Sequence, residues 1–293
     1  MIQYLEQNAK LVDSYLEEKL TWEKAPSILV EAIKYGTLGG GKKVRSSLLF
    51  ATGNAFGIER KELLPLAGTL EMVHSFSLIH DDLPCMDNDD FRRGKPSLHK
   101  AFGEALAVLA GDALLVEGIS LTIRDANFLS HFGSEKILQS IQILLEALGV
   151  EGMVGGQVLD IEGEGKKVSQ EQILEIYRLK TACLIRAAIL CGAILGNASS
   201  QEQERLDKFG WLIGECFQLK DDILDLTGES EQLGKTIGKD LLQDKATLIK
   251  VKGLDSAQAI LKEKFTQAKS LLPDEDRYQL LLGLAKFIVE RER

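Results

Sequence analysis

Residues 63–87 have the sequence LLPLAGTLEMVHSFSLIHDDLPCMD, in which apolar residues recur every three or four positions before an acidic end. This spacing predicts a helix over Leu63 to His80. Pro84 disfavours helical geometry at the residue before it, so the helix is expected to end at the aspartates. The acidic cluster Asp81 to Asp87 therefore occupies the C-terminal turn of a helix.

A second acidic cluster, Asp221 to Asp225, ends another periodic stretch, residues 201–225. The first and last aspartates of this cluster continue an apolar stripe at steps of four. That stripe consists of Phe209, Ile213 and Phe217. A helix C-terminus carries partial negative charge, which disfavours an anion by ~0.3–1 kcal/mol unless a cation offsets it. The two clusters therefore favour bound divalent metal over the alternative, ordinary surface carboxylates.

Helical spacing dominates the whole chain, and the alternation typical of strands is not convincing anywhere. Glycine, asparagine and serine occupy the gaps between the periodic segments, and only five prolines occur. The pattern predicts an all-α bundle. We expect one domain over residues 1–293, because no Pro/Gly/Ser-rich linker divides the chain. The other periodic segments are 105–124, 135–148 and 170–195.

The composition is that of an ordinary globular protein, with 45% hydrophobic residues and a formal net charge of -9 over 293 residues. The negative charge disfavours nucleic acid or anionic membrane as the main partner. No stretch is expected to reach the roughly 20 apolar residues of a membrane span, and the start lacks a signal-peptide pattern. The four cysteines form neither a CxxC pair nor a zinc-like spacing, which indicates a reducing, cytoplasmic location.

The glycine-rich turn from Gly36 to Lys43 is close to a phosphate-binding P-loop. It departs from that motif because Lys43 replaces the magnesium-binding Ser or Thr, and because the preceding segment looks helical. The turn can still bind phosphate through backbone N–H groups and basic side chains. A structural turn followed by a solvated basic face is an equally good interpretation. Arg92 and Arg93 add positive charge directly after the first acidic cluster, which suits an anionic ligand that bridges metal and protein.

These motifs resemble those of the bacterial short-chain isoprenyl diphosphate synthases, most of all the farnesyl diphosphate synthases within that family. The resemblance rests on EMVHSFSLIHDDLPCMDNDDFRRGKPSLHKAFGEALAVLAGDALL and on GGGKKVR before it, with GGQVLD, KT, FQLKDDILD and LGKTIGKD after it. It implies an all-α homodimer whose helices surround a deep central cavity. It also implies three Mg²⁺ ions that bind the diphosphate of an allylic substrate and assist its departure.

The resemblance implies a role for each matched residue. The metal ligands would be Asp81, Asp82, Asp87, Asp221 and Asp225, and the catalytic group would comprise Asp81, Asp82, Asp87, Asp221 and Lys180. The allylic diphosphate would be bound by Arg92, Lys180, Lys235 and Lys245, with Thr181 and Gln218 beside the reacting carbon. Isopentenyl diphosphate would be bound without metal by Lys42, Arg45, His74 and Arg93. One departure is Ser46, which stands where the family pattern usually has proline.

The implied reaction adds isopentenyl diphosphate to dimethylallyl and then geranyl diphosphate. In the family, the residue five positions before the first acidic motif can close the tail cavity, and here it is Phe76. Phe76 and Ser77 are therefore the residues expected to set product length. A bulky residue there favours a C15 product, farnesyl diphosphate. The alternatives are a geranylgeranyl diphosphate synthase and a noncatalytic regulatory subunit of a heteromeric prenyl synthase. A terpene cyclase is disfavoured, because it should lack Lys42, Arg45 and His74.

Overall fold

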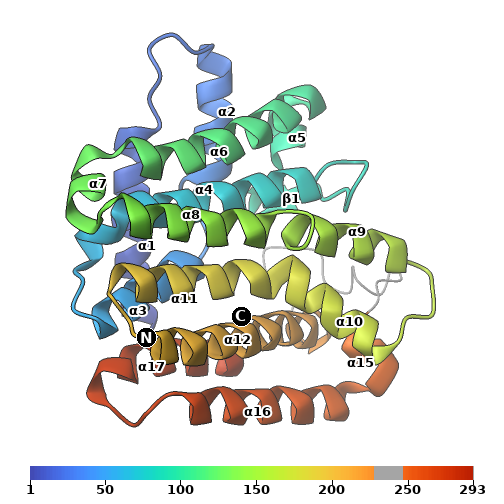
Figure 1. Cartoon of the computed structure of the whole chain (residues 1–293). Coiled ribbons are helices and arrows are strands. Elements are labelled where there is room, and N and C mark those ends of the chain that lie inside the picture. Colours follow the sequence, from blue (N-terminus) through green and yellow to red (C-terminus); the bar gives the residue numbers. More distant parts are fainter. Residues whose placement is uncertain (228–246, 293) are drawn as a thin grey trace. The chain divides into compact units, whose positions relative to one another are not determined.

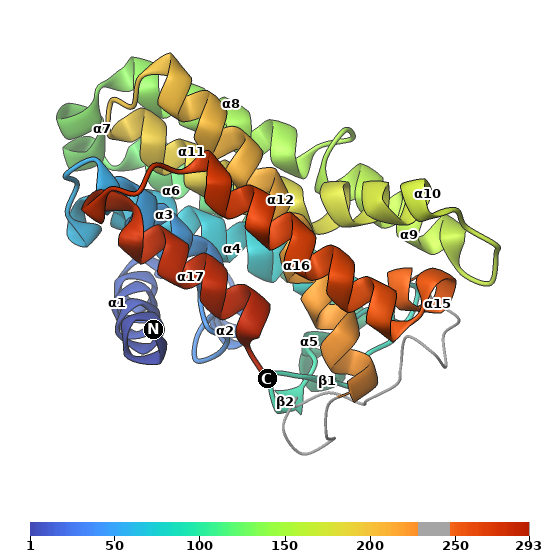
Figure 2. The same ribbon diagram turned by 90° about the horizontal axis from the view of Figure 1, so that it is seen from below.

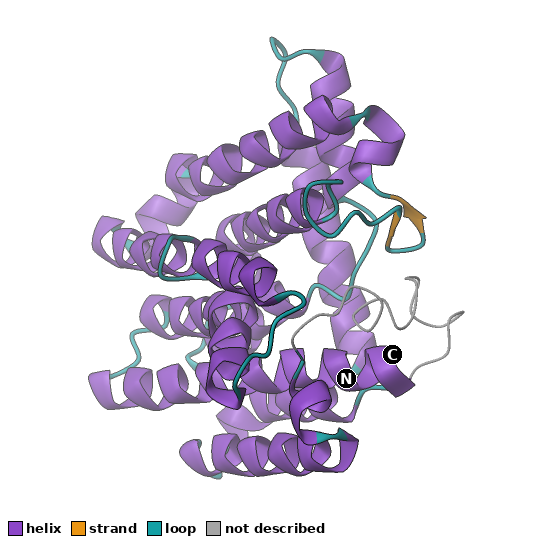
Figure 3. Cartoon of the chain, turned by 90° about the vertical axis from the view of Figure 1, so that its right-hand side faces the viewer, coloured by secondary structure: helices purple, strands orange, loops and turns teal. Residues whose placement is uncertain are grey.

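The computed structural model describes residues 1–227 and 247–292. Apart from one short hairpin, the regular segments in this part of the chain are helices, which confirms the all-α class (Figure 3). The chain forms two compact units. The first comprises Met1–Phe50 and Glu59–Ser134, and the second comprises Ala51–Ile58 and Glu135–Arg293. That residues 1–293 act as one domain stays a prediction.

The first unit is built around α4 (Leu64–Asp81) and α6 (Glu104–Arg124), which pack side by side (Figure 1). The other elements that begin in this unit are α1 (Ile2–Lys19), α2 (Ser27–Thr37), α3 (Val44–Ala55), the 3-10 helix η1 (Arg60–Leu63), β1 (Phe91–Arg92), β2 (Lys95–Pro96), α5 (Leu98–Phe102) and α7 (Ala126–Phe132).

Helix α4 matches the predicted segment to within one residue at each end. Pro65 lies in its first turn, where the missing N–H costs no hydrogen bond. Residues of α4 are buried on nearly every side, as a central helix requires. Close approach to α6 is possible because Gly118 has no side chain: a Cβ there would lie 3.1 Å from the Cβ of Met72. The hydroxyl of Thr69 adds a polar link by donating to the carbonyl of Gly118 at 2.6 Å.

The second unit is centred on α12 (Ser200–Thr227), which lies alongside α16 (Leu254–Leu271) in Figure 2. The other elements are α8 (Ser134–Leu148), α9 (Met153–Gly163), α10 (Gln170–Ile176), the π-helix η2 (Tyr177–Ala182), α11 (Cys183–Leu195), α15 (Leu248–Lys252), the 3-10 helix η3 (Asp276–Tyr278) and α17 (Gln279–Glu290).

Small residues set the packing of this unit. A Cβ at Gly214 of α12 would lie 2.4 Å from the Cα of Ala182, and one at Gly210 would lie 2.9 Å from the Cα of Arg186. These distances are far below ordinary contact, so the two glycines allow α12 to approach η2 and α11 closely. The core beneath is apolar, with Ile173, Cys216, Leu219, Ile223 and Leu261 among its buried members.

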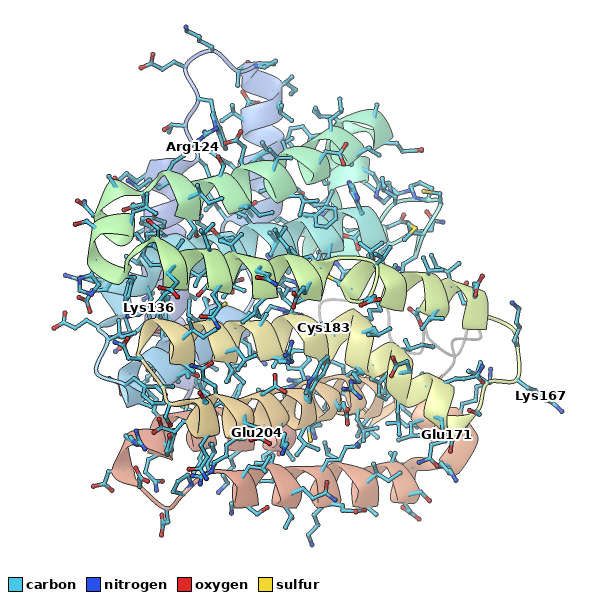
Figure 4. The ribbon with its side chains drawn as sticks, viewed as in Figure 1. Arg124, Lys136, Lys167, Glu171, Cys183 and Glu204 are labelled. Atoms are coloured by element: carbon cyan, nitrogen blue, oxygen red, sulfur yellow. The ribbon has the colours of Figure 1, made fainter. Side chains whose placement is uncertain are left out.

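All four cysteines are free thiols. Cys183, labelled in Figure 4, Cys191 and Cys216 are buried, whereas Cys85 is exposed. Burial raises the pKa of the Cys183 thiol to about 11 and those of Cys191 and Cys216 to about 12. The three buried cysteines therefore act as small apolar core residues.

The expectation that no stretch is long and apolar enough to span a membrane is wrong for two helical stretches, Glu104–Arg124 and Ser134–Gly163. Length and composition alone support this classification, and core helices of soluble proteins pass the same test. One face of helix α6 packs against α4, but only 33% of its apolar window is buried.

Candidate active site

The first acidic cluster forms a loop that folds back on the C-terminal end of α4. The backbone N–H of Asp87 donates to the carbonyl of Asp81 at 2.8 Å. The backbone N–H of Asp89 likewise donates to the carbonyl of Asp82 at 3.2 Å. Asp81 and Asp87 are half-buried and Asp82 is buried. Three of the predicted metal ligands thus lie together at the negative end of a helix.

Asp82 is paired with Arg92. The Arg92 Nε donates to the two carboxylate oxygens of Asp82 at 3.0 and 3.2 Å, and Nη2 donates to Oδ1 as well. Nη2 also donates to Asp89 Oδ2 at 3.2 Å. Burial lowers the pKa of Arg92, but the hydrogen bonds to Asp82 and the surrounding carboxylates raise it more, so the guanidinium stays charged. Asp82 was predicted as a metal ligand and Arg92 as a diphosphate ligand; the structure joins them in one buried ion pair.

The hairpin of β1 and β2 directs Arg93 toward the glycine-rich turn. Arg93 and Gly94 both have positive φ, 55° and 76°, as the two central residues of a tight hairpin turn do. This conformation is uncommon for arginine. The Arg93 side chain lies against the turn, because a Cβ at Gly40 would be 2.6 Å from its Cδ and one at Gly41 would be 3.2 Å from its guanidinium. The structure therefore brings together two motifs that lie about 50 residues apart in the sequence.

Arg45 and His74 also meet as predicted, with Nη1 of Arg45 donating to Nε2 of His74 at 3.1 Å. Since Nε2 accepts this bond, the neutral ring carries its proton on Nδ1. Burial lowers the pKa of His74 well below its usual value, and Arg45, Arg93, Lys43 and Arg92 lower it further. His74 is therefore neutral at pH 7 among several cations, an environment suited to a multiply charged anion.

The two lysines of the glycine-rich turn lie in different environments. Lys43 is buried, donates to the carbonyl of Thr37 at 3.0 Å and pairs with Asp13 at 3.2 Å, so it stabilises the turn. Lys42 is exposed. Ser46, at the departure from the family pattern, is also bonded, because its hydroxyl donates to Oε1 of buried Glu71 at 2.8 Å and its N–H to the same oxygen at 3.2 Å. Proline could make neither bond.

In the second unit, the π-helix η2 presents Lys180. The ammonium of Lys180 pairs with Asp160 of α9 at 2.6 Å. Helix α9 approaches η2 closely, because a Cβ at Gly156 would lie 2.3 Å from the backbone nitrogen of Lys180. Gly156 belongs to the GGQVLD motif, so that motif positions Asp160 against the lysine. Short π-helical turns often occur at functional sites.

Thr181 and Gln218 are adjacent, as predicted, with the Thr181 hydroxyl donating to Gln218 Oε1 at 2.6 Å. Nε2 of Gln218 donates in turn to Oδ1 of buried Asp222 at 3.0 Å. The Tyr177 hydroxyl donates to the other oxygen of Asp222 and accepts the backbone N–H of Leu248 at 2.9 Å. Asp222 therefore connects η2, α12 and the start of α15.

We expect Tyr177→Phe to lower the free energy of unfolding by about 1–3 kcal/mol, because the N–H of Leu248 and the carboxylate of Asp222 each lose a buried partner. Urea denaturation measures this difference. The matched control is Tyr278→Phe, which removes the hydroxyl of another buried tyrosine. Among residues 1–227 and 247–292, that hydroxyl has no hydrogen-bond partner. Equal losses from the two variants would contradict the role given to the Tyr177 hydroxyl.

The second acidic cluster emerges from the core toward the surface. Phe209 and Ile213 are fully buried, whereas Asp221 and Asp225 are half-buried. Nη2 of Arg291, near the C-terminus, binds Asp221 and donates to the carbonyl of Phe217 at 3.1 Å. The predicted diphosphate ligands Lys235 and Lys245 lie outside the described residues.

The acidic loop suits Mg²⁺ bound together with a diphosphate. Mg²⁺ usually keeps several waters and takes one or two carboxylates plus substrate phosphates. Asp81 and Asp87 offer two such carboxylates, joined by a backbone hydrogen bond, and Asp81 lies close enough to Arg92 to raise its pKa. Within residues 1–227 and 247–292, no three acidic, imidazole or thiol side chains form a ready-made metal cage.

Sequence reasoning assigned no role to several residues that the structure joins to the predicted ones. Asp160 carried a weak signal, as a polar group within GGQVLD. Tyr177 and Arg291 carried none, because each partner lies 45 to 70 positions away. These residues and their partners are Asp160 with Lys180, Tyr177 with Asp222, Glu71 with Ser46, and Arg291 with Asp221.

Comparison with known proteins identifies the family of the chain. The polyprenyl synthetase family model matches residues 26–277. The chain is 42% identical over 294 residues to the heterodimeric geranylgeranyl pyrophosphate synthase large subunit 1 of Arabidopsis thaliana, covering 99% of this chain and 79% of that protein. It is 41% identical over 269 residues to farnesyl diphosphate synthase of Bacillus subtilis (strain 168), covering 92% and 90%. Geranyltransferase from Helicobacter pylori, solved with magnesium and isoprenyl diphosphate, has a TM-score of 0.85 and 31% identity, covering 98% and 96%.

Fold, site and relatives together define a short-chain trans-prenyl diphosphate synthase. The chain belongs to the polyprenyl synthetase family.

Proposed function

We propose that the protein makes (2E,6E)-farnesyl diphosphate by adding isopentenyl diphosphate to dimethylallyl diphosphate and then to geranyl diphosphate. The observation that carries the C15 product is Phe76, which is buried, 9% exposed, on α4 about one turn before Asp81. A prenyl tail that grows away from a diphosphate at Asp81 along α4 would meet this ring. A bulky ring at that depth limits the tail to C15.

Isopentenyl diphosphate would be bound by the cations around the glycine-rich turn. Arg45 and Arg93 keep their charge there, and His74 is neutral, so its ring can accept or donate hydrogen bonds without repelling the arginines. Burial lowers the pKa of Arg93, and Arg92 lowers it further against the attraction of Glu71. An anion relieves this repulsion. Exposed Lys42 would add charge at the entrance to the site.

The allylic diphosphate would be bound by Arg92, Lys180, Lys235 and Lys245. Mg²⁺, three ions by the family resemblance, would act as a Lewis acid on the departing diphosphate, held by Asp81, Asp87 and Asp221 with support from Asp82 and Asp225. The hydrogen-bonded pair of Thr181 and Gln218 would orient its oxygens toward the allylic carbon. The departing diphosphate can accept the proton that is lost after condensation.

Incubation with Mg²⁺, labelled isopentenyl diphosphate and, separately, C5, C10 and C15 allylic acceptors tests this proposal. We expect the C5 and C10 acceptors to be extended to C15. If the C15 acceptor is extended efficiently, the protein makes geranylgeranyl diphosphate, an alternative supported by the Arabidopsis relative. If no acceptor is extended, the chain is a noncatalytic subunit and the enzyme proposal fails.

We expect Phe76→Ala to yield products longer than C15, because removal of the buried ring deepens the space available to the tail. Chromatography of the dephosphorylated products measures the shift. Ser77→Ala, at the other predicted chain-length position, removes only a hydroxyl that donates to the carbonyl of His74 at 2.9 Å, so it should lengthen the product less. A C15 product from Phe76→Ala would remove the basis for this tail limit.

We also propose a homodimer that uses the outer face of α6. Leu109, Val116 and Ile123 lie seven residues apart on that helix and are 57%, 64% and 45% exposed. Residues at this spacing form one stripe along a helix. An apolar stripe of this kind is typical of a helix that packs against a second copy.

We expect Val116→Asp to convert the dimer into a monomer, because a two-fold interface would bury the new carboxylate twice. Size-exclusion chromatography with light scattering gives the mass of the particle. Ile28→Asp changes an apolar residue of similar exposure, 50%, on α2 and should leave the dimer intact. A monomeric wild-type protein, or a Val116→Asp dimer of unchanged stability, would contradict the assignment.

We propose a reducing compartment such as the bacterial cytoplasm. The four free thiols support this location, since none of them is paired in a disulfide.

A further inference from the structure

The His80 ring fills a notch between α4 and α6 that exists only because residue 111 is glycine. A Cβ at Gly111 would lie 2.2 Å from Nε2 of His80 and 2.5 Å from its Cδ2. Gly111 is in the interior of α6, where glycine is a poor helix former. Close approach of the imidazole gives a physical reason for glycine at this position.

The imidazole is fixed in this notch by a hydrogen bond across the two helices. Nε2 of His80 lies 3.1 Å from the carbonyl oxygen of Val108. A carbonyl can only accept, so Nε2 carries the proton and donates it. Asp112 lies on the same side, with Oδ1 4.0 Å from Nε2. The ring orientation is therefore set by α6 as well as by the backbone of α4.

The fixed ring contacts Phe76. The centroids of the two rings are 4.9 Å apart with an interplanar angle of 73°, an edge-to-face arrangement. The two residues are four positions apart on α4, so their side chains are neighbours on one face. Phe76 therefore packs against a ring that is itself held by a bond to α6.

We infer that His80 is a positioning residue for product length: the imidazole, seated against Gly111 and bonded to Val108, fixes the Phe76 ring that ends the prenyl tail. The inference rests on the proposed role of Phe76. Without the imidazole, Phe76 loses its edge-to-face partner and can rotate out of the path of the tail. Products longer than C15 then become accessible.

Product ratios measured with excess isopentenyl diphosphate test this inference independently of the rate of turnover. We expect His80→Ala to raise the C20:C15 ratio by roughly 2- to 10-fold, the factor that corresponds to loss of one aromatic pair. Gly111→Ala should shift the ratio in the same direction, because its methyl group displaces the imidazole. The double variant His80→Ala/Gly111→Ala relieves the clash, so it should melt at a higher temperature than Gly111→Ala and keep the longer products.

Gly118→Ala is the matched control, because it also adds a methyl group between α6 and α4 but contacts Met72 and Val73 instead of His80. It should keep the wild-type ratio. The inference is overturned if His80→Ala and Gly111→Ala keep the wild-type ratio while Phe76→Ala lengthens the product. It is also overturned if Gly118→Ala shifts the ratio as much as Gly111→Ala. If Phe76→Ala makes only C15, the proposed tail limit itself fails, and the role of His80 fails with it.

Discussion

Asp81→Asn is expected to reduce turnover by about 1,000-fold at saturating Mg²⁺ and substrates. Asp81 ends α4, is half-buried and shares its loop with Asp87 through a backbone hydrogen bond of 2.8 Å. Loss of a charged ligand from a metal that stabilises the departing diphosphate costs about 4 kcal/mol of transition-state stabilisation, and ~1.36 kcal/mol corresponds to a factor of ten. Steady-state kinetics with geranyl and isopentenyl diphosphate measures the effect.

The same substitution should change stability only slightly. A carboxylate is unfavourable at the negative end of a helix, but Asp81 also attracts Arg92, so the two effects of its neutralisation oppose each other. Thermal unfolding without ligands checks this expectation. Asp90→Asn is the matched control, since Asp90 is exposed on the same loop, pairs with Lys100 at 2.8 Å and has no predicted role in catalysis. A large loss of stability in Asp81→Asn, or equal loss of turnover in both variants, would contradict the role of Asp81.

Arg92→Met is expected to lower the free energy of unfolding by about 3–5 kcal/mol, because it leaves a buried carboxylate without its partner. The side chain of Asp82 is only 3% exposed and that of Arg92 is 14% exposed. Nε alone makes bonds of 3.0 and 3.2 Å to the two carboxylate oxygens, so a lysine could not reproduce the geometry. Urea denaturation gives the change in free energy, and kinetics gives the accompanying loss of allylic substrate binding.

The double variant Asp82→Asn/Arg92→Met separates the two contributions. Removal of both charges should recover most of the lost stability, because the penalty arises from the unpaired carboxylate. Turnover should stay low, because the diphosphate still lacks the guanidinium. If the double variant is as unstable as Arg92→Met, packing of the arginine stem is the cause instead of the charge.

Local sequence signals predicted the positions of the two acidic clusters well. Helical periodicity and Pro84 place Asp81 at the end of α4, where the structure has it. The family resemblance, and not local spacing, grouped Arg45 with His74, and the two side chains form a hydrogen bond. In the glycine-rich turn, Lys43 has a structural role and Lys42 is exposed, and phosphate binding there stays a prediction.

Two adjacent aspartates show what local sequence signals do not predict. Asp221 and Asp222 are neighbours in sequence, but they point about 100° apart around α12. Asp222 is 5% exposed and bonded to Tyr177, whereas the side chain of Asp221 is 47% exposed and pairs with Arg291. The helical period predicts the angle between the two aspartates, but the sequence does not predict the hydrogen-bond partner of either one.

The sequence by itself determined that the chain is helical, where its acidic helix ends lie and which basic residues accompany them. These properties depend on spacing within one or two helical turns and on proline and glycine, which act locally. Only the tertiary structure decided that Arg92 binds Asp82, that Tyr177 binds Asp222 and that His80 fits against Gly111. Such pairs, often on different helices, form only when the helices pack against each other. The period of a single helix therefore does not predict them.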